Sequence, residues 1–257
     1  MQTGYANGNY YEVHGTGAPL VVLHGGLASC ATIGPLLRAF GQTRRAIGID
    51  LQAHGRTADT DRPIRYEHVA DDVAGVLDHL KLERADVIGY SFGGGAAWQL
   101  AFRHPQRVQK LVIVSTHVRR SAWYDEVLAA AEHLGPAAAE MMKQSPGYKS
   151  YAAIAPRPED FPQLLGKMGD LLRRDFDWTA EVGKLAMPVQ LVFADADSVK
   201  PAAIMELWEL LGGGKGDAGW DGSRRPVSQL AILPGTTHYS IFDSPLLPPV
   251  VAGFLDA

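Results

Sequence analysis

Ser91 stands at the centre of a stretch whose residue types could carry out nucleophilic chemistry. The run Asp86-Val-Ile-Gly-Tyr-Ser-Phe-Gly-Gly-Gly-Ala96 is typical of a short apolar strand, a turn of small residues and a helix that continues to Arg103. Glycines two residues before and after the serine would let strand and helix approach closely in a strained turn. Such a turn lifts the hydroxyl clear of the sheet and directs the helix N-terminus at it. A glycine-rich turn with an incidental serine fits the same letters, so the rest of the chain must decide.

A base and a carboxylate that could activate this serine occur later in the chain. A serine hydroxyl is a poor nucleophile until a base takes its proton, and a histidine base needs a carboxylate to hold its tautomer. His238 follows the last apolar strand, and the segment Ala194-Asp195-Ala196-Asp197 follows the strand before it. Both Asp195 and Asp197 are therefore candidates for the carboxylate.

Short apolar runs alternate with helical patterns along most of the chain. Uninterrupted runs of strand length are typical of strands that are buried on both faces. This alternation predicts parallel βαβ units with helices on both sides of one sheet, and sites at the carboxyl ends of its strands. His24, Asp50, Ser91 and Ser115 all fall at such ends. The expected strands are 10–13, 20–23, 45–50, 86–90, 108–114, 188–193 and 230–233, and the expected helices outside the middle of the chain are 35–40, 66–80, 96–103, 202–211 and a last one opened by Ser244-Pro245.

The middle of the chain breaks this rhythm. Between about 117 and 185 no convincing strand is present, whereas 121–134, 136–143 and 160–174 have helical patterns. We expect these residues to form a helical cap inserted into a core made of 1–116 and 186–257. Its aromatic and methionine side chains would mostly pack on the core, and some would line a pocket. The residues that we expect to bind substrate are Leu27, His117, Trp123 and Tyr124.

Five motifs in this order resemble the α/β-hydrolase fold family over essentially the whole chain. The motifs are His24-Gly-Gly, Asp50-Leu-x-x-His-Gly-Arg-Thr57, Gly89-x-Ser-x-Gly93, Asp195-x-Asp197-x-x-x-Pro201 and Gly235-x-x-His238. Ser, Asp, His is also the order in which that family carries its catalytic residues. The resemblance implies an α/β fold, with a mostly parallel sheet flanked by helices and an inserted helical cap. It is nearest to the capped hydrolases of carboxylic esters, lactones and related acyl compounds.

The resemblance assigns a role to each matching residue. Ser91 would be the nucleophile and His238 the base. Asp197 is favoured as the acid because it stands four residues before Pro201, which leaves Asp195 to stabilise the turn.

The backbone N–H groups of Gly26 and Phe92 would form the oxyanion hole, with Leu27 as the alternative to Gly26. His24 and His54 would be structural. We also interpret Asp50, Arg56 and Thr57 as residues that fix the loop after the second strand, because no metal or phosphate geometry accompanies them.

The family resemblance leaves several activities open. The leading hypothesis is a serine hydrolase that needs no cofactor and cleaves an ester-like bond through an acyl-enzyme. Perhydrolase or cofactor-free haloperoxidase chemistry uses the same triad, and carbon–carbon bond hydrolysis is a further alternative. Haloalkane dehalogenases and epoxide hydrolases carry an aspartate at the position of Ser91, which argues against both. A small-ligand receptor without catalysis is the alternative from a different class.

Composition narrows the possible partners. The 257 residues are 46% hydrophobic and 20% charged, and a formal net charge of −4 gives no reason to expect nucleic acid or an anionic membrane as partner. We expect a small-molecule substrate with an apolar arm, and no metal, because clustered Cys/His ligands are absent. The first residues lack a secretory signal pattern, and the single cysteine, Cys30, fits a packing role in a reducing cytoplasm. The sequence leaves the oligomeric state open.

Overall fold

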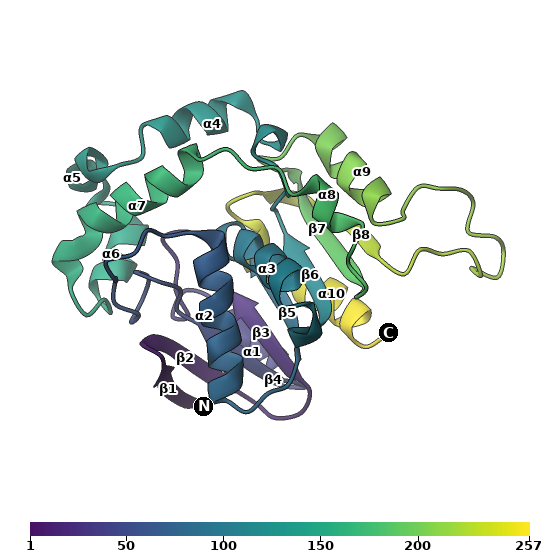
Figure 1. The fold of residues 1–257 in the computed structure, drawn as a ribbon, viewed down its shortest axis with the longest axis horizontal. Coiled ribbons are helices and arrows are strands. Elements are labelled where there is room, and N and C mark those ends of the chain that lie inside the picture. Colours follow the sequence, from purple (N-terminus) through teal and green to yellow (C-terminus); the bar gives the residue numbers. More distant parts are fainter.

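One eight-stranded sheet runs through the protein, whose computed structural model describes residues 1–257. The strands lie in the order β1-β2-β4-β3-β5-β6-β7-β8 (Figure 1). The pairs β1–β2 and β2–β4 are antiparallel, and all other neighbours are parallel. This confirms the mostly parallel sheet. The strands are β1 Gln2–Ala6, β2 Asn9–His14, β3 Pro19–Leu23, β4 Arg45–Ile49, β5 Ala85–Tyr90, β6 Val108–Val114, β7 Val189–Ala196 and β8 Gln229–Thr237.

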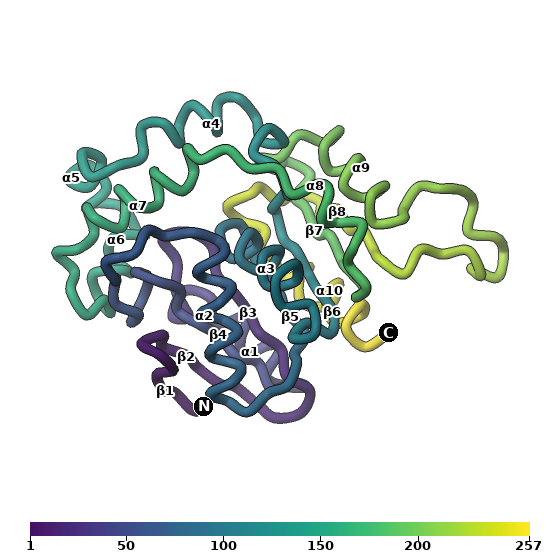
Figure 2. Tube along the Cα trace, viewed as in Figure 1, coloured from purple at the N-terminus to yellow at the C-terminus, as the bar shows by residue number.

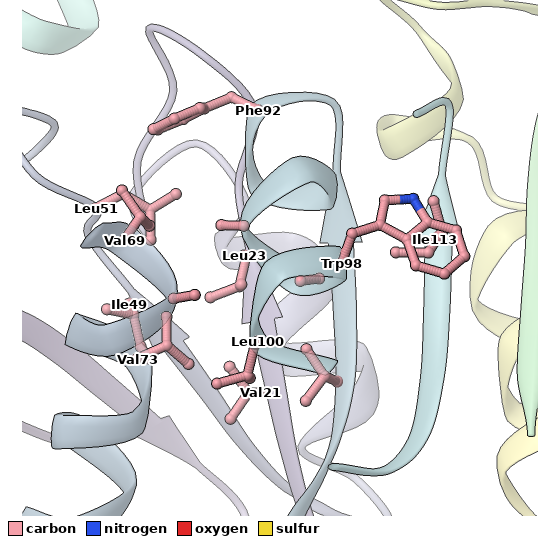
Figure 3. Packing of buried hydrophobic residues seen from close by; sticks show 14 of the residues in the cluster. Val21, Leu23, Ile49, Leu51, Val69, Val73, Phe92, Trp98, Leu100 and Ile113 are labelled. Carbon is pink, nitrogen blue, oxygen red and sulfur yellow. The ribbon is translucent and has the colours of Figure 1, made fainter. Parts of the chain in front are cut away.

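Helices cover both faces of this sheet because the central strands are apolar on both sides. Val21 and Leu23 of β3 point into one hydrophobic cluster, and Leu20 and Val22 point into another. The first cluster includes α2 and α3 (Figure 3), and the second includes α1 and α10. The helices outside the segment between β6 and β7 are α1 Gly34–Phe40, α2 Tyr66–His79, α3 Phe92–Arg103, α9 Pro201–Leu210 and α10 Leu247–Leu255.

Two details at the ends of the chain differ from the sequence-based expectation. Strand β1 was not predicted, because it lies at the sheet edge, where most of its side chains are exposed and only that of Ala6 is buried. It pairs with β2 through the turn at Asn7 and Gly8, which both have positive φ, a favoured conformation for a tight hairpin. Helix α10 starts at Leu247 rather than directly after Ser244, because Pro245 and Leu246 form a turn in which the N–H of Leu247 donates to the carbonyl of Ser244 at 3.1 Å.

The segment between β6 and β7 contains helices and no strand, as expected. Figure 1 shows α4 and α7 lying across the end of the sheet at which α3 begins. Lys167 of α7 forms an ion pair with Asp59 of the core, at 2.7 Å, and donates hydrogen bonds to the carbonyl groups of Thr60 and Arg62. The helices of this segment are α4 Asp125–Glu132, α5 Ala139–Met142, α6 Pro146–Ala152, α7 Phe161–Arg173 and α8 Thr179–Val182, and its 3-10 turns are Arg120–Ala122, Pro136–Ala138 and Pro158–Asp160. A further 3-10 turn, Pro105–Arg107, precedes β6.

The glycine-rich segment 212–226 forms a loop that extends away from the body of the molecule (Figure 2). Trp220 in this loop is fully exposed. None of the helices is both long enough and apolar enough to span a bilayer.

Candidate active site

Ser91 occupies the turn between β5 and α3 with a strained backbone. Its φ of 50° and ψ of −114° lie in a region that residues with a side chain rarely adopt. A Cβ atom on Gly89 would lie 2.4 Å from the carbonyl oxygen of Gly93, and a Cβ on Gly93 would lie 2.5 Å from that of His24. Neither position therefore tolerates a side chain, which is the steric reason for glycine at both.

Hydrogen bonds from neighbouring strands hold this turn in place. The Ser91 N–H donates to the carbonyl of Val114 at 3.1 Å, and the Thr116 hydroxyl donates to the carbonyl of Ser91 at 2.8 Å. The N–H of Gly93 donates to the carbonyl of His24 at 3.1 Å. The serine is thus fixed against the ends of both β6 and β3.

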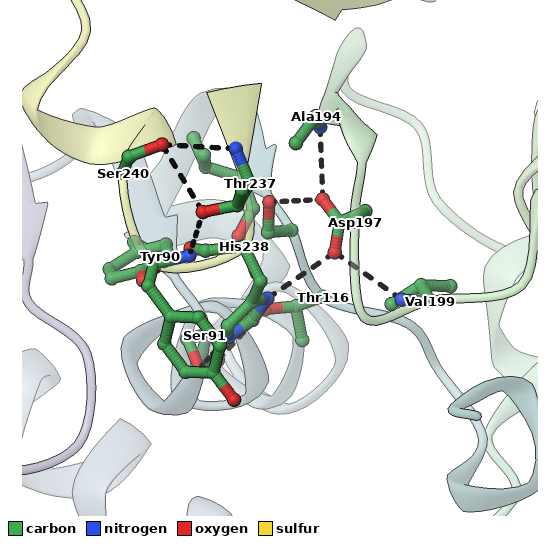
Figure 4. Close-up of polar contacts among 12 residues, drawn as sticks. Tyr90, Ser91, Thr116, Ala194, Asp197, Val199, Thr237, His238 and Ser240 are labelled. Carbon is green, nitrogen blue, oxygen red and sulfur yellow. Dashed lines mark hydrogen bonds and ion pairs between the residues drawn. The ribbon is translucent and has the colours of Figure 1, made fainter. Parts of the chain in front are cut away.

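Ser91, His238 and Asp197 form a continuous hydrogen-bonded chain (Figure 4). The Ser91 Oγ lies 3.1 Å from Nε2 of His238, and Nδ1 of His238 lies 3.3 Å from Oδ1 of Asp197. The Tyr90 hydroxyl donates to the His238 carbonyl at 2.6 Å and thereby fixes the turn that carries the histidine. With the ring proton on Nδ1, Nε2 is free to accept the serine proton, which is the geometry of a general base.

The two candidate carboxylates have different surroundings. Asp195 is exposed, and its oxygens accept hydrogen bonds from the N–H groups of Gly235 and Thr236 at 2.9 and 3.0 Å. It therefore connects the ends of β7 and β8 and forms no hydrogen bond with the histidine ring. Asp197 has a side chain that is only 1% exposed, and it is the carboxylate that the fold brings to His238.

Asp197 has a further partner, Ser115, which was only weakly indicated by its place at a strand end. The Ser115 hydroxyl donates to its Oδ2 at 2.5 Å, and the backbone N–H of Ala194 donates to the same oxygen at 2.9 Å. Burial opposes ionisation, but the hydrogen bonds from His238, Ser115 and Ala194 outweigh it and hold the pKa of Asp197 below its ordinary value. The position of Ser115 at the end of β6, next to β7, is the signal that could have indicated this role.

The two expected oxyanion donors lie side by side. Neither the N–H of Gly26 nor that of Phe92 has a hydrogen-bond acceptor within the protein, and the same holds for Leu27. A Cβ atom on Gly26 would lie 3.9 Å from that of Phe92, and both residues line one cavity with Ser91. These N–H groups are available to a ligand, and which of them bind an oxyanion stays a prediction.

Buried histidines hold the loops around these donors. His24 donates through Nδ1 to the carbonyl of Gly25 at 2.8 Å and accepts through Nε2 from the N–H of Leu51 at 3.1 Å. The ring of His54 stacks on Phe92, with 5.3 Å between ring centroids. Burial lowers the pKa of His24 to about 4 and that of His54 to about 3, so both rings are neutral at pH 7. Their contacts agree with the structural roles that the sequence suggested.

The buried carboxylate at the end of β4 also shapes a loop. Asp50 accepts hydrogen bonds from the N–H of Cys30 at 2.6 Å and from that of Arg56 at 2.7 Å. The Thr57 hydroxyl donates to the Asp50 carbonyl at 2.6 Å. Cys30 is itself fully buried in the hydrophobic core, as a packing residue would be.

Two adjoining cavities meet at Ser91. The larger has a volume of about 450 Å³ and lies under α4, and the smaller has about 210 Å³ and lies on the side of the expected oxyanion donors. Six residues line both: Ser91, Trp123, Leu134, Leu172, His238 and Tyr239. The smaller cavity is also lined by Gly26, Leu27, Tyr66, Tyr90, Phe92 and Met168, and the larger by Arg120, Val127, Leu128, Ala130, Ala131, Met142 and Ser198.

Only two of the four expected substrate-binding residues line these cavities. Trp123 and Leu27 line the cavities, but His117 and Tyr124 line neither. The ring of His117 is buried; it donates to the carbonyl of Ala203 at 3.0 Å and accepts from the N–H of Arg119. Tyr124 precedes α4, and its N–H donates to the carbonyl of Ser198 at 3.1 Å. A position just after a strand end did not distinguish a pocket wall from the packed layer beside it.

The chain belongs to the α/β-hydrolase fold family, whose model matches residues 18–204. It is 36% identical over 149 residues to RutD of Caulobacter sp. (strain K31), a proposed carbamate hydrolase, and this match covers 54% of the chain and 55% of RutD. The chain thus spans about half the length of the curated relatives it matches.

Solved structures agree with this family over the whole fold. An E-2-(acetamidomethylene)succinate hydrolase superposes with a TM-score of 0.76 at 20% identity, covering 97% of this chain and 95% of that one. The enol-lactonase of Burkholderia xenovorans LB400 superposes with a TM-score of 0.71 at 22% identity, covering all of both chains. At these identities the likeness establishes the fold.

Conservative substitutions can distinguish the roles of Asp197 and Asp195. Asp197→Asn should lower kcat for hydrolysis by about 10³–10⁴-fold, because the neutral amide no longer stabilises the charged imidazole. Ser115→Ala should lower it by about tenfold, because one hydrogen bond to Asp197 is lost. The matched control, Asp195→Asn, should change kcat by less than tenfold. Steady-state kinetics of the three folded variants test this order, and a larger loss in Asp195→Asn than in Asp197→Asn would contradict it.

The buried histidines predict how stability depends on pH. The folded-state pKa values of His24, His54 and His117 are about 4, 3 and 4, below the ordinary value of 6.5. The unfolded chain therefore binds more protons below pH 6.5, so the free energy of unfolding should fall between pH 6.5 and about 4. Urea unfolding at several pH values measures the slope. His54→Asn should make this slope of unfolding free energy against pH shallower, and the exposed control His133→Asn should leave it unchanged. Equal slopes in both variants would contradict the contribution of buried His54 to the pH dependence.

Proposed function

We propose that this protein is a serine hydrolase that cleaves a carboxylic ester or lactone through an acyl-enzyme intermediate. The observation that carries the proposal is the hydrogen-bonded chain from Ser91 through His238 to the buried Asp197. The free N–H groups of Gly26 and Phe92 beside Ser91 support it further. Nucleophile, base, orienting carboxylate and oxyanion donors are the set of groups that acyl transfer requires.

Each group has a defined task in this reaction. The Ser91 Oγ attacks the carbonyl carbon while its proton passes to Nε2 of His238. The carbonyl oxygen becomes an oxyanion and accepts hydrogen bonds from the Gly26 and Phe92 N–H groups. As the carbon–oxygen bond breaks, His238 returns the proton to the departing alkoxide. Water then attacks the acyl-enzyme with His238 again as base, which releases the acid and restores Ser91.

The cavities favour a small substrate with one larger arm. Nine of the thirteen residues that line the larger cavity are hydrophobic, as are nine of the twelve that line the smaller one. Because the two cavities meet at Ser91, the acyl and alcohol portions of an ester can extend to opposite sides of the reacting carbon. An apolar arm in the larger cavity is the arrangement that we infer.

A carbamate is the second candidate substrate class. The relative RutD is a proposed carbamate hydrolase, and its match covers about half of each chain. A carbamate carbonyl presents the same geometry to Ser91 and the same developing oxyanion to the N–H groups. The difference lies in the adjacent nitrogen, whose electron donation makes the carbonyl less reactive.

The direct test compares wild type and Ser91→Ala on p-nitrophenyl esters of increasing chain length and on a p-nitrophenyl carbamate. Wild type should turn over the esters, and Ser91→Ala should lose about three or more orders of magnitude in kcat. The matched control, Ser223→Ala in the exposed loop, should keep wild-type kinetics. Circular dichroism checks that all three are folded.

The outcomes separate the candidate functions. Faster Ser91-dependent turnover of the carbamate than of any ester would favour the second candidate. Equal rates in wild type and Ser91→Ala would contradict the proposal. A folded wild type without turnover, but with thermal stabilisation by a non-hydrolysed ester analogue, would instead indicate a receptor.

A further inference from the structure

Arg120 is the one permanently charged residue in the wall of the larger cavity. That wall otherwise consists of apolar side chains from the cap together with Ser91, Ser198, His238 and Tyr239. A guanidinium keeps its positive charge at every physiological pH. Its side chain is only 20% exposed, so water screens the charge less than it would at an open surface. A cavity that contacts the candidate nucleophile therefore contains one fixed positive charge.

Part of the Arg120 side chain is held by the protein itself. Its Nε–H donates to the carbonyl of Leu172, at the end of α7, at 2.8 Å. Its Nη2 donates to Oε1 of Glu132, in α4, at 2.9 Å. These two bonds hold the guanidinium plane in a fixed orientation between two cap helices.

The remaining N–H groups of Arg120 are unused. A guanidinium has five N–H groups and two of them bond to Leu172 and Glu132, which leaves three, two of them on Nη1, without an acceptor in the protein. Glu132 offsets the charge only weakly, because its side chain is 52% exposed and therefore well solvated. Arg120, which lines the cavity, is thus an oriented positive group with three N–H donors that the protein does not use.

We propose that Arg120 determines specificity, and that the preferred substrate carries a carboxylate on the arm that fills the larger cavity. This inference rests on the proposed function and narrows it to esters or lactones of acidic compounds. A carboxylate can accept two hydrogen bonds from a guanidinium in one plane, which gives direction as well as attraction. The apolar walls then contact the carbon chain between the carboxylate and the ester group.

A purely structural role for Arg120 makes a different prediction. Its bonds to Leu172 and Glu132 connect α7 with α4, so its loss could loosen the cap. A loosened cap would lower activity toward charged and neutral substrates alike. A recognition role changes the ratio between them, and this ratio is the quantity to measure.

The experiment uses pairs of esters that differ only in a terminal carboxylate. Monomethyl glutarate, compared with methyl pentanoate, carries the carboxylate on the acyl arm, and 4-acetoxybutanoate, compared with butyl acetate, carries it on the alcohol arm. Hydrolysis is followed in a pH-stat at low ionic strength. For at least one pair, wild type should have kcat/KM about 10- to 100-fold higher for the charged ester.

Substitutions at Arg120 and at its partner test the cause of this preference. Arg120→Met should lower kcat/KM for the charged ester about tenfold or more beyond any change for its neutral counterpart, and so abolish or reverse the preference. Arg120→Lys, which keeps the charge, should retain part of it. Glu132→Gln removes the carboxylate that competes for Arg120 and should increase the preference for the charged ester. If Arg120 only connected α7 with α4, this substitution would weaken the connection without increasing the preference.

The result that overturns the inference is distinct from failure of the proposed function. Ser91-dependent hydrolysis with no preference in either pair, or an equal loss of both esters in Arg120→Met, would leave the serine hydrolase in place and overturn the role of Arg120. Equal hydrolysis by wild type and Ser91→Ala would overturn the proposed function itself. Thermal unfolding of Arg120→Met distinguishes a lost contact from a lost fold.

Discussion

The strained turn at Ser91 is the constraint on which the arrangement of the site depends. Its backbone, with φ of 50°, is maintained because the end of β5, the start of α3 and the end of β3 pack so closely that side chains at Gly89 and Gly93 would collide with backbone oxygens. The turn also places Phe92 next to Gly26, and the N–H groups of both residues lack an acceptor within the protein. One steric arrangement therefore places the candidate nucleophile and the candidate oxyanion donors together.

The other members of the site reach Ser91 through the parallel sheet. Asp197 follows β7 and His238 follows β8, and these strands are neighbours on the same side of β5. The carboxyl ends of parallel strands meet at one edge, so residues far apart in the sequence come within hydrogen-bond distance there. Polar groups from other strand ends then fix them: Ser115 binds Asp197, and Tyr90 binds the carbonyl of His238.

Much of this arrangement could be predicted from the sequence because strand ends and turn residues leave local signals. The apolar runs gave the parallel strands, and the chain order of the motifs gave Ser91, Asp197 and His238. Strand β1 left no apolar run, since it is an exposed edge strand recruited by the hairpin at Asn7 and Gly8. Local patterns were thus sufficient for the core of the sheet and insufficient at its edge.

The walls of the cavities were much less predictable. Which face of a helix between β6 and β7 lines the cavity depends on how α4 and α7 lie across the sheet, and no local pattern encodes that. His117 was expected in the wall but is packed against the Ala203 carbonyl, whereas Arg120, three residues later, lines the cavity. The side chain that sets the charge of the cavity therefore became visible only in the folded structure.

The most direct test of Ser91 as an activated nucleophile is to find the residue with which a fluorophosphonate reacts. Such a reagent phosphonylates a serine only when a base activates it and donors stabilise the phosphoryl oxygen. Intact-mass and peptide mass spectrometry should show one adduct per chain, located on Ser91, at a rate that falls by orders of magnitude in His238→Ala. A folded protein that forms no adduct, or forms it on another serine, would contradict the role of Ser91 as the activated nucleophile.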